Sequence, residues 1–159
     1  MNRIAQSILA VALTGLFSTI ALAQNQASIP SASSATMGAE TTDQLFQDFG
    51  GKAGIGKVVD DFLTIWQADP RISKRLTDAD VERLGLMLKE QFTQLTGGPA
   101  TYSGKDMKAA HDGMGIRNAE FNALAEDLQL SMGKNGVSSR SQNRLLAKLA
   151  PMQHAIVTK

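Results

Sequence analysis

The stretch LTGGPATYSGKDMKAAH (Leu95–His111) carries the strongest structural signal in the chain. It is rich in glycine, as is its continuation to Arg117, yet it also holds a tyrosine, a methionine and a histidine. A connection of roughly twenty residues without regular structure is unusual inside a compact domain and is often functional. Residues 105–111 favour a short helix, on which Met107 and His111 would share one face, four positions apart.

Amphipathic helical patterns flank this stretch on both sides. Apolar residues recur at helical spacing in four segments, which are Ile55–Trp66, Val81–Leu95, Phe121–Met132 and Leu145–Ile156. A shorter helix is predicted at 43–49, where it ends on two glycines. No segment alternates with a period of two residues over a useful length. The sequence therefore predicts an all-α domain.

Glycine, proline and polar capping residues mark the ends of these helices. The Gly-Gly-Pro run at 97–99 ends the second long helix. Asn118 is predicted to cap the third at its N-terminus, and either Ser138 or Ser139 the fourth. Pro151 lies inside the fourth pattern and should kink that helix.

The composition excludes several classes of site. The 159-residue chain has 16 Lys and Arg against 15 Asp and Glu, so no excess of positive charge supports non-specific nucleic-acid binding. It has no cysteine, which rules out disulfides, thiolate metal sites, cysteine nucleophiles and haem attachment through C-x-x-C-H. Its two histidines nearly exclude a multi-histidine metal site. Any chemistry must depend on few ionisable groups or on a cofactor.

The N-terminal residues have the pattern of a secretory signal peptide. Arg3 is followed by an uncharged apolar segment at 8–20 and by the cleavage pattern Ala21-Leu22-Ala23. A membrane-spanning helix needs about 20 apolar residues, so we expect cleavage after Ala23, export to the periplasm or exterior, and no stable membrane anchor afterwards. Residues 24–41 are typical of a disordered linker, which leaves 42–159 as the globular domain.

Taken one at a time, the candidate residues have ordinary explanations. A lone histidine on a glycine-rich loop, such as His111, is more often exposed to solvent than a ligand, and His154 near the C-terminus fits a surface residue. The run Gly50-Gly51-x-x-Gly54 has neither the Lys-Ser/Thr end nor the preceding strand of a phosphate-binding loop. Residue chemistry alone therefore assigns no site.

The order and spacing of several motifs, in contrast, resemble the truncated haemoglobin family, group I, from about Leu45 to Ile156. The motifs are LFQDFGGKAGIGKVVDDF (45–62), ADPRI (68–72), LTGGPATYSGKDMKAAH (95–111), IRNAEFNALAEDL (116–128) and LAPM (149–152). The resemblance implies a two-over-two helical sandwich around one non-covalent haem b. It also accounts for the unusual glycine-rich connection.

The resemblance implies a role for individual residues. His111 matches the proximal histidine, whose ring nitrogen binds the haem iron. Tyr102 matches a residue near a haem propionate. The remaining expected cofactor-binding residues are Met107, Ile116 and Phe121 at haem-packing positions, Leu63, Leu84 and Leu88 at the three main distal positions, Leu76 at the usual distal aromatic, and Phe92.

The departures from the family pattern concern the distal side. The family commonly has tyrosine at the position of Leu63 and often glutamine at Leu84, Leu88 or both, and these groups donate hydrogen bonds to bound oxygen. Leu76 replaces a phenylalanine that usually wedges the haem. These replacements argue against tight oxygen storage and efficient nitric-oxide dioxygenation, and they leave haem binding largely intact.

The expected function is reversible binding of small diatomic gases (NO, CO or O₂) at haem iron through an apolar pocket, in a monomeric protein. The alternative is a non-enzymatic exported haem carrier or interaction module on a globin shell. Gas binding or sensing is favoured over catalysis, and a redox role would need an electron donor that the sequence does not identify. A haem absorbance band would distinguish both haem hypotheses from an empty shell.

Overall fold

A computed structural model describes residues 43–76 and 78–159, and the proposed signal peptide (1–23) and linker (24–41) lie outside these described residues. The described part is helical. Its elements are α1 (Gln44–Asp48), α2 (Gly51–Ala68), the 3₁₀ turn η1 (Ser73–Arg75), α3 (Asp78–Leu95), α4 (Met107–His111), α5 (Asn118–Lys134), α6 (Ser139–Leu149), the 3₁₀ turn η2 (Ala150–Met152) and α7 (Gln153–Ile156). Among these residues the only β pairing is an isolated bridge between Ile116 and Val157.

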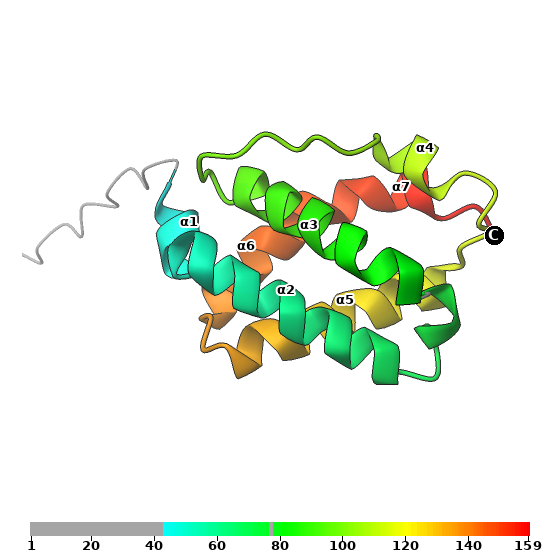
Figure 1. The fold of residues 1–159 in the computed structure, drawn as a ribbon, viewed down its shortest axis with the longest axis horizontal. Coiled ribbons are helices and arrows are strands. Elements are labelled where there is room, and N and C mark those ends of the chain that lie inside the picture. Colours follow the sequence, from blue (N-terminus) through cyan, green and yellow to red (C-terminus); the bar gives the residue numbers. More distant parts are fainter. Residues whose placement is uncertain (1–42, 77) are drawn as a thin grey trace, which may run out of the picture. The chain divides into compact units, whose positions relative to one another are not determined.

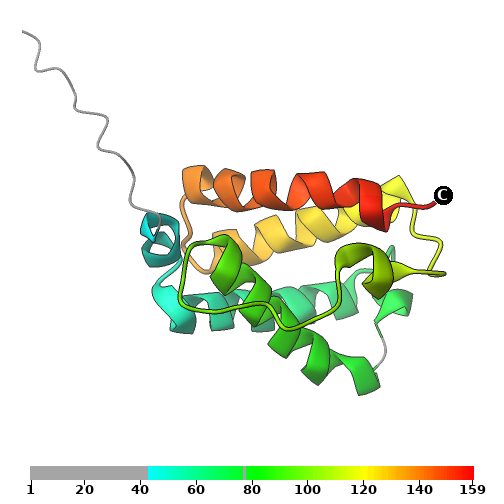
Figure 2. The same ribbon diagram turned by 90° about the horizontal axis from the view of Figure 1, so that it is seen from above.

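The long helices form two layers. In Figure 1, α2 and α3 lie in front of α5 and α6, and Figure 2 shows the same two pairs from above. Helix α2 packs against both α3 and α5. Side chains from α1, α2, α3, α5 and α6 build one apolar core between the layers, including Leu45, Ile55, Val59, Phe92, Met132 and Leu145. The all-α, two-over-two arrangement predicted above is confirmed.

The glycine run after α1 builds a tight corner between two helices. Gly50 and Gly51 have φ values of +76° and +64°, which glycine adopts without steric cost. A Cβ atom on Gly54 would lie 1.8 Å from the Phe49 carbonyl oxygen, so only glycine lets α2 start this close to the end of α1. The motif therefore serves packing.

The helices end where the sequence signals predict, except at the starts of α5 and α4. Ser138 caps α6 by accepting a hydrogen bond from the Ser141 N–H at 3.2 Å, and Pro151 interrupts the last helical pattern with the turn η2. Helix α5 begins at Asn118 itself, so its N-cap is Arg117, one residue before the predicted cap. The Glu120 carboxylate accepts the Arg117 N–H at 2.9 Å instead, while the Asn118 side chain accepts a hydrogen bond from Gln153 at 2.9 Å.

Helix α4 is shorter than the predicted segment 105–111, because Asp106 caps it. The Asp106 carboxylate accepts a hydrogen bond from the Ala109 N–H at 2.9 Å, so the helix runs from Met107 to His111. The cap leaves Met107 and His111 at the two ends of a single helical stretch. The predicted spacing of these two residues on one helix is confirmed.

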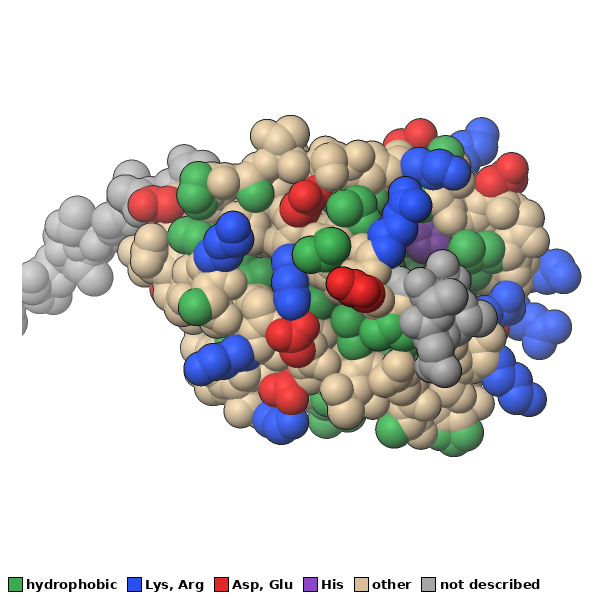
Figure 3. All heavy atoms as spheres, in the orientation of Figure 1, with side chains coloured by type: hydrophobic (Ala, Val, Ile, Leu, Met, Phe, Trp, Pro, Cys, Tyr) green, Lys and Arg blue, Asp and Glu red, His purple; other side chains and the backbone are tan. Residues whose placement is uncertain are grey.

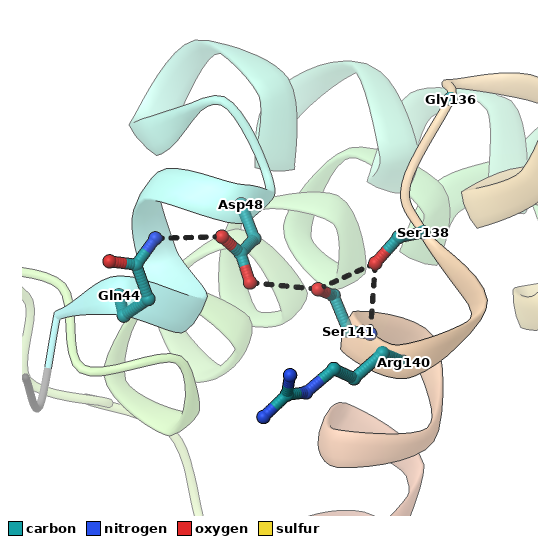
Figure 4. A pocket seen from close by; sticks show the side chains of 6 residues that line it. All are labelled: Gln44, Asp48, Gly136, Ser138, Arg140 and Ser141. Atoms are coloured by element: carbon teal, nitrogen blue, oxygen red, sulfur yellow. Dashed lines mark hydrogen bonds between the residues drawn. The ribbon is translucent and has the colours of Figure 1, made fainter. Parts of the chain in front are cut away.

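Polar contacts attach α1 to the start of α6. Asp48 accepts hydrogen bonds from Gln44 at 2.9 Å and from the Ser141 hydroxyl at 2.8 Å, as Figure 4 shows. These donors favour the charged carboxylate and so lower the pKa of Asp48. Within the part of the chain that the structure describes, no helix has both the length and the apolar character that crossing a membrane requires.

Candidate haem site

The glycine-rich connection runs back along α3 and is bonded to it. The N–H and hydroxyl of Ser103 both donate to the Glu90 carboxylate, at 3.0 and 2.7 Å, and the Tyr102 N–H donates to Gln94. The two bonds from Ser103 lower the pKa of Glu90. The connection runs antiparallel to α3 and so brings α4 next to α7 (Figures 1 and 2).

Tyr102 folds over Gly104. A Cβ atom on Gly104 would lie 2.2 Å from the Tyr102 hydroxyl oxygen, so this half-buried orientation of the phenol requires glycine two residues later. Burial raises the pKa of Tyr102, and the nearby carboxylates of Glu90 and Asp106 add to the shift. The phenol therefore stays protonated and can donate a hydrogen bond at neutral pH.

The imidazole of His111 is oriented by its own helix. Its Nδ1 lies 2.7 Å from the Met107 carbonyl oxygen, one turn back. A carbonyl oxygen can only accept, so Nδ1 carries the proton and donates. In the neutral ring the lone pair then resides on Nε2, which is the arrangement found in histidines that bind a metal through Nε2.

Gln91 connects α3 to the helix that carries this histidine. Its side-chain amide, almost fully buried, lies 3.5 Å from the Met107 sulfur and 3.8 Å from the Met152 sulfur. Thioether sulfur is a weak acceptor, so these contacts fix direction more than they add stability. The Gln91 amide is therefore directed toward the two methionines.

The predicted distal residues come together on α2, α3 and the segment between them. Leu63 and Phe92 are buried in the core, while Leu76, Leu84 and Leu88 are half-buried and pack against that core. Figure 3 shows hydrophobic side chains gathered on this face of the molecule, with a histidine side chain visible near them. The half-buried leucines leave apolar surface that a flat apolar group can cover.

The other two residues predicted to pack on haem, Ile116 and Phe121, follow His111 in the chain. Ile116 pairs with the C-terminal end of the chain, where its carbonyl oxygen accepts the Thr158 N–H at 3.0 Å. Phe121 is half-buried in the first turn of α5. The candidate residues therefore fall into two sets, Leu63, Leu76, Leu84, Leu88 and Phe92 on one side and Tyr102, Met107, His111, Ile116 and Phe121 on the other.

This arrangement fits haem. One imidazole has its Nδ1 bonded to a carbonyl oxygen, which leaves Nε2 for a ligand, and several of the candidate apolar side chains are only half-buried. In the described residues no three His, Cys, Asp or Glu side chains converge to hold a bare metal ion. Two shallow hollows, one at α1 and α6 (Figure 4) and one at α5 and α6, are lined by none of the candidate residues.

Comparisons with known proteins agree with this geometry. A profile of the bacterial-like globin family matches residues 44–158. The chain is 31% identical over 114 residues to a group 1 truncated hemoglobin of Mycolicibacterium paratuberculosis, covering 72% of this chain and 84% of that protein. It is 32% identical over 96 residues to a group 1 truncated hemoglobin of Tetrahymena thermophila, covering 60% and 79%.

Solved structures agree on the fold. The truncated hemoglobin from Tetrahymena pyriformis in its Fe(III) form matches with a TM-score of 0.69 and 26% identity, over 72% of this chain and 98% of that one. The 2/2 hemoglobin from Synechococcus sp. PCC 7002 matches with a TM-score of 0.66 and 23% identity, over the same shares, and shows the same fold. The chain therefore belongs to the bacterial-like globin family and is a haem-binding truncated globin, related to those of group 1.

Proposed function

We propose that this globin holds haem b non-covalently through His111 Nε2 and binds small diatomic gases reversibly on the side lined by Leu63, Leu84 and Leu88. The bond between His111 Nδ1 and the Met107 carbonyl, at 2.7 Å, is the observation that carries the proposal. It fixes the tautomer and the direction of the ring before a cofactor enters. Haem, once bound, supplies an iron atom that takes up diatomic ligands.

The apolar side chains determine which gases this site favours. Bound dioxygen carries partial negative charge and gains from a hydrogen-bond donor, whereas carbon monoxide and nitric oxide carry less charge. One such bond contributes about 1–3 kcal/mol, or roughly 5- to 150-fold in affinity. Leucines at 63, 84 and 88 supply no donor, so we propose fast oxygen release and normal binding of carbon monoxide and nitric oxide.

Two polar residues of α3 that could supply a donor are engaged elsewhere. Lys89 forms an ion pair with Asp60 at 2.7 Å on the outside of α2. The Gln91 amide lies against the sulfur atoms of Met107 and Met152. Redirecting either group would break these contacts, which supports an apolar distal side.

The absorption spectrum of the purified, haem-reconstituted protein tests the proposal. Wild type should show a Soret band that shifts on reduction and again with carbon monoxide. His111→Gly should lose haem, and added imidazole should restore the spectrum by replacing the missing ring. His154→Gly, which removes an exposed histidine on α7, is the matched control and should behave as wild type.

Two results would contradict the proposal. An unchanged spectrum in His111→Gly would show that another group binds the iron. No Soret band in reconstituted wild type would show a globin shell without cofactor.

A further inference from the structure

Arg75 connects the two sides of the candidate site. It is the last residue of η1 and directly precedes Leu76. Its Nη1 donates to the Met114 carbonyl oxygen at 2.8 Å, and its Nε and Nη2 donate to the two Glu120 carboxylate oxygens at 2.8 and 3.1 Å. One guanidinium therefore joins the segment before α3 both to the loop after His111 and to the first turn of α5.

The part of the loop that Arg75 contacts, residues 113–115, has little conformational restriction of its own. Met114 stands between Gly113 and Gly115, whose φ values are +74° and +59°, and glycine restricts the backbone less than any other residue. Met114 itself is half exposed. Its N–H donates to the His111 carbonyl at 3.2 Å, so the residue whose carbonyl Arg75 holds is itself bonded to the backbone of His111.

Glu120, which accepts two of the three Arg75 hydrogen bonds, is itself held in place. Its carboxylate also accepts the Arg117 N–H at 2.9 Å, and its side chain is only 20% exposed. The Arg117 N–H and the Arg75 guanidinium both lower the pKa of Glu120, so it stays charged at neutral pH. A bidentate pair of this kind fixes the direction of the guanidinium as well as its position.

We propose that Arg75 is a positioning residue for His111. It fixes the loop 112–117 from the side of the site that carries Leu76 and so sets the direction in which the imidazole is presented. The inference rests on the proposed role of His111 as the iron ligand. Sequence reasoning missed it because Arg75 and Met114 are 39 positions apart and no local pattern connects them.

Arg71 supplies a matched control. It lies in the same connection between α2 and α3 and also bonds to α5, through Glu126 at 2.6 Å. Its bonds go to Asp69 and Glu126, and it lies 3.8 Å from Asp127, so it does not reach the loop 112–117. Arg71→Met removes a comparable cross-link without removing the loop contact.

The experiment compares wild type, Arg75→Met, Arg75→Lys and Arg71→Met in two states. In the haem-free protein, amide hydrogen exchange over residues 112–117 should become about 5-fold faster in Arg75→Met, the loss expected for one partly exposed charged hydrogen bond. In the reduced, reconstituted protein, resonance Raman should show the iron–histidine stretching band shifted and broadened, with haem loss faster by a similar factor. Arg75→Lys should be intermediate because one ammonium cannot replace the guanidinium fork.

The outcomes separate this inference from the proposed function. If wild type has no iron–histidine band, the proposed function fails, while the exchange measurement still tests the loop contact. If the band is present and Arg75→Met matches wild type in band and exchange, the inference is overturned. Equal effects of Arg71→Met on the loop and the band would also overturn it, because they would show general loosening of the connection.

Discussion

The Leu63 side chain in α2 packs directly against the backbone of Gly85 in α3. A Cβ atom on Gly85 would lie 3.2 Å from Leu63 Cδ1, closer than an ordinary van der Waals contact. Leu63 is 6% exposed, so the contact lies inside the core as well as next to the distal leucines. The absence of a side chain at Gly85 therefore determines how closely the two helices approach at this point.

Gly85→Ala should destabilise the protein by about 1 kcal/mol. Alanine gains up to about 1 kcal/mol of helix propensity, but overpacking a core typically costs about 1–3 kcal/mol. Leu63→Val removes the crowded Cδ1 atom, so the double variant should regain part of the loss. Urea unfolding of wild type, the two single variants and the double variant measures this coupling. Strictly additive changes in the free energy of unfolding would mean that the contact between Leu63 and Gly85 does not affect stability.

Leu63→Tyr should slow oxygen release from the reduced protein. A phenol hydroxyl on the distal side would supply the missing donor, for a gain of about 1–3 kcal/mol. Leu63→Phe carries the same ring without the hydroxyl and should leave oxygen release fast. Stopped-flow dissociation of oxygen from the three proteins is the measurement. Slow release in wild type, unchanged by tyrosine, would reveal a donor elsewhere and remove the argument for an apolar pocket.

The helices could be predicted from the sequence because their signals are local. The apolar stripe of α2, the Gly-Gly-Pro run after α3 and the break at Pro151 each lie within a few residues of the feature they determine. The predicted N-cap of α5 was wrong by one residue, because the helix begins at Asn118 and Arg117 is its N-cap. Asn118 is a good capping residue by type, but its side chain is bonded to Gln153 of α7, which is 35 positions away.

The candidate site was only partly predictable. Met107 and His111 share a helix, so their relation could be predicted from spacing, whereas the role of a lone histidine came from resemblance and not from its chemistry. The contact of Gln91 with Met107 and that of Arg75 with Met114 depend on how α3 and η1 pack on the segment 100–117. Such contacts between distant segments leave no periodic pattern in the sequence.

Gly54→Ala should destabilise the fold by about 3 kcal/mol or more, because a Cβ atom there would overlap the Phe49 carbonyl oxygen at 1.8 Å and force the backbone apart. Gly56→Ala is the matched control in the same helix. Nothing lies within 4 Å of a Cβ atom at Gly56, so alanine there should stabilise by about 0.5–1 kcal/mol. Thermal unfolding of both variants tests the contrast. Similar losses in both would mean that the corner between α1 and α2 does not require glycine.

The Asp127 carboxylate in α5 is buried, and neither hydrogen bonds nor a close ion pair fully compensate its charge. It is 2% exposed, and its Oδ2 has no hydrogen-bond partner among the described residues. Its Oδ1 lies 3.8 Å from Arg71, which is bonded mainly to Asp69 and Glu126. Burial, followed by repulsion from Asp69, raises the pKa of Asp127 above its ordinary value of 3.8.

The sign of the resulting pH dependence follows from this shift. The folded protein binds the proton of Asp127 more tightly than the unfolded chain does, so this group makes the fold less stable as pH rises through and above 3.8. Asp127→Asn removes that cost. The variant should be more stable than wild type by about 1 kcal/mol at pH 7, since an ionised buried group costs more than a buried amide.

The measurement is the free energy of unfolding from pH 3 to pH 7, taken as the difference between Asp127→Asn and wild type. Subtraction cancels the carboxylates with lowered pKa, such as Glu120 and Asp48, which both proteins share. The difference should be smallest in acid, grow as pH rises and then level off. Glu126→Gln neutralises the exposed neighbour that bonds to Arg71 and adds the smallest share of the repulsion on Asp127, so its gain should be clearly smaller. A difference for Asp127→Asn that stays flat or falls with pH would mean that Arg71 compensates the Asp127 charge in full.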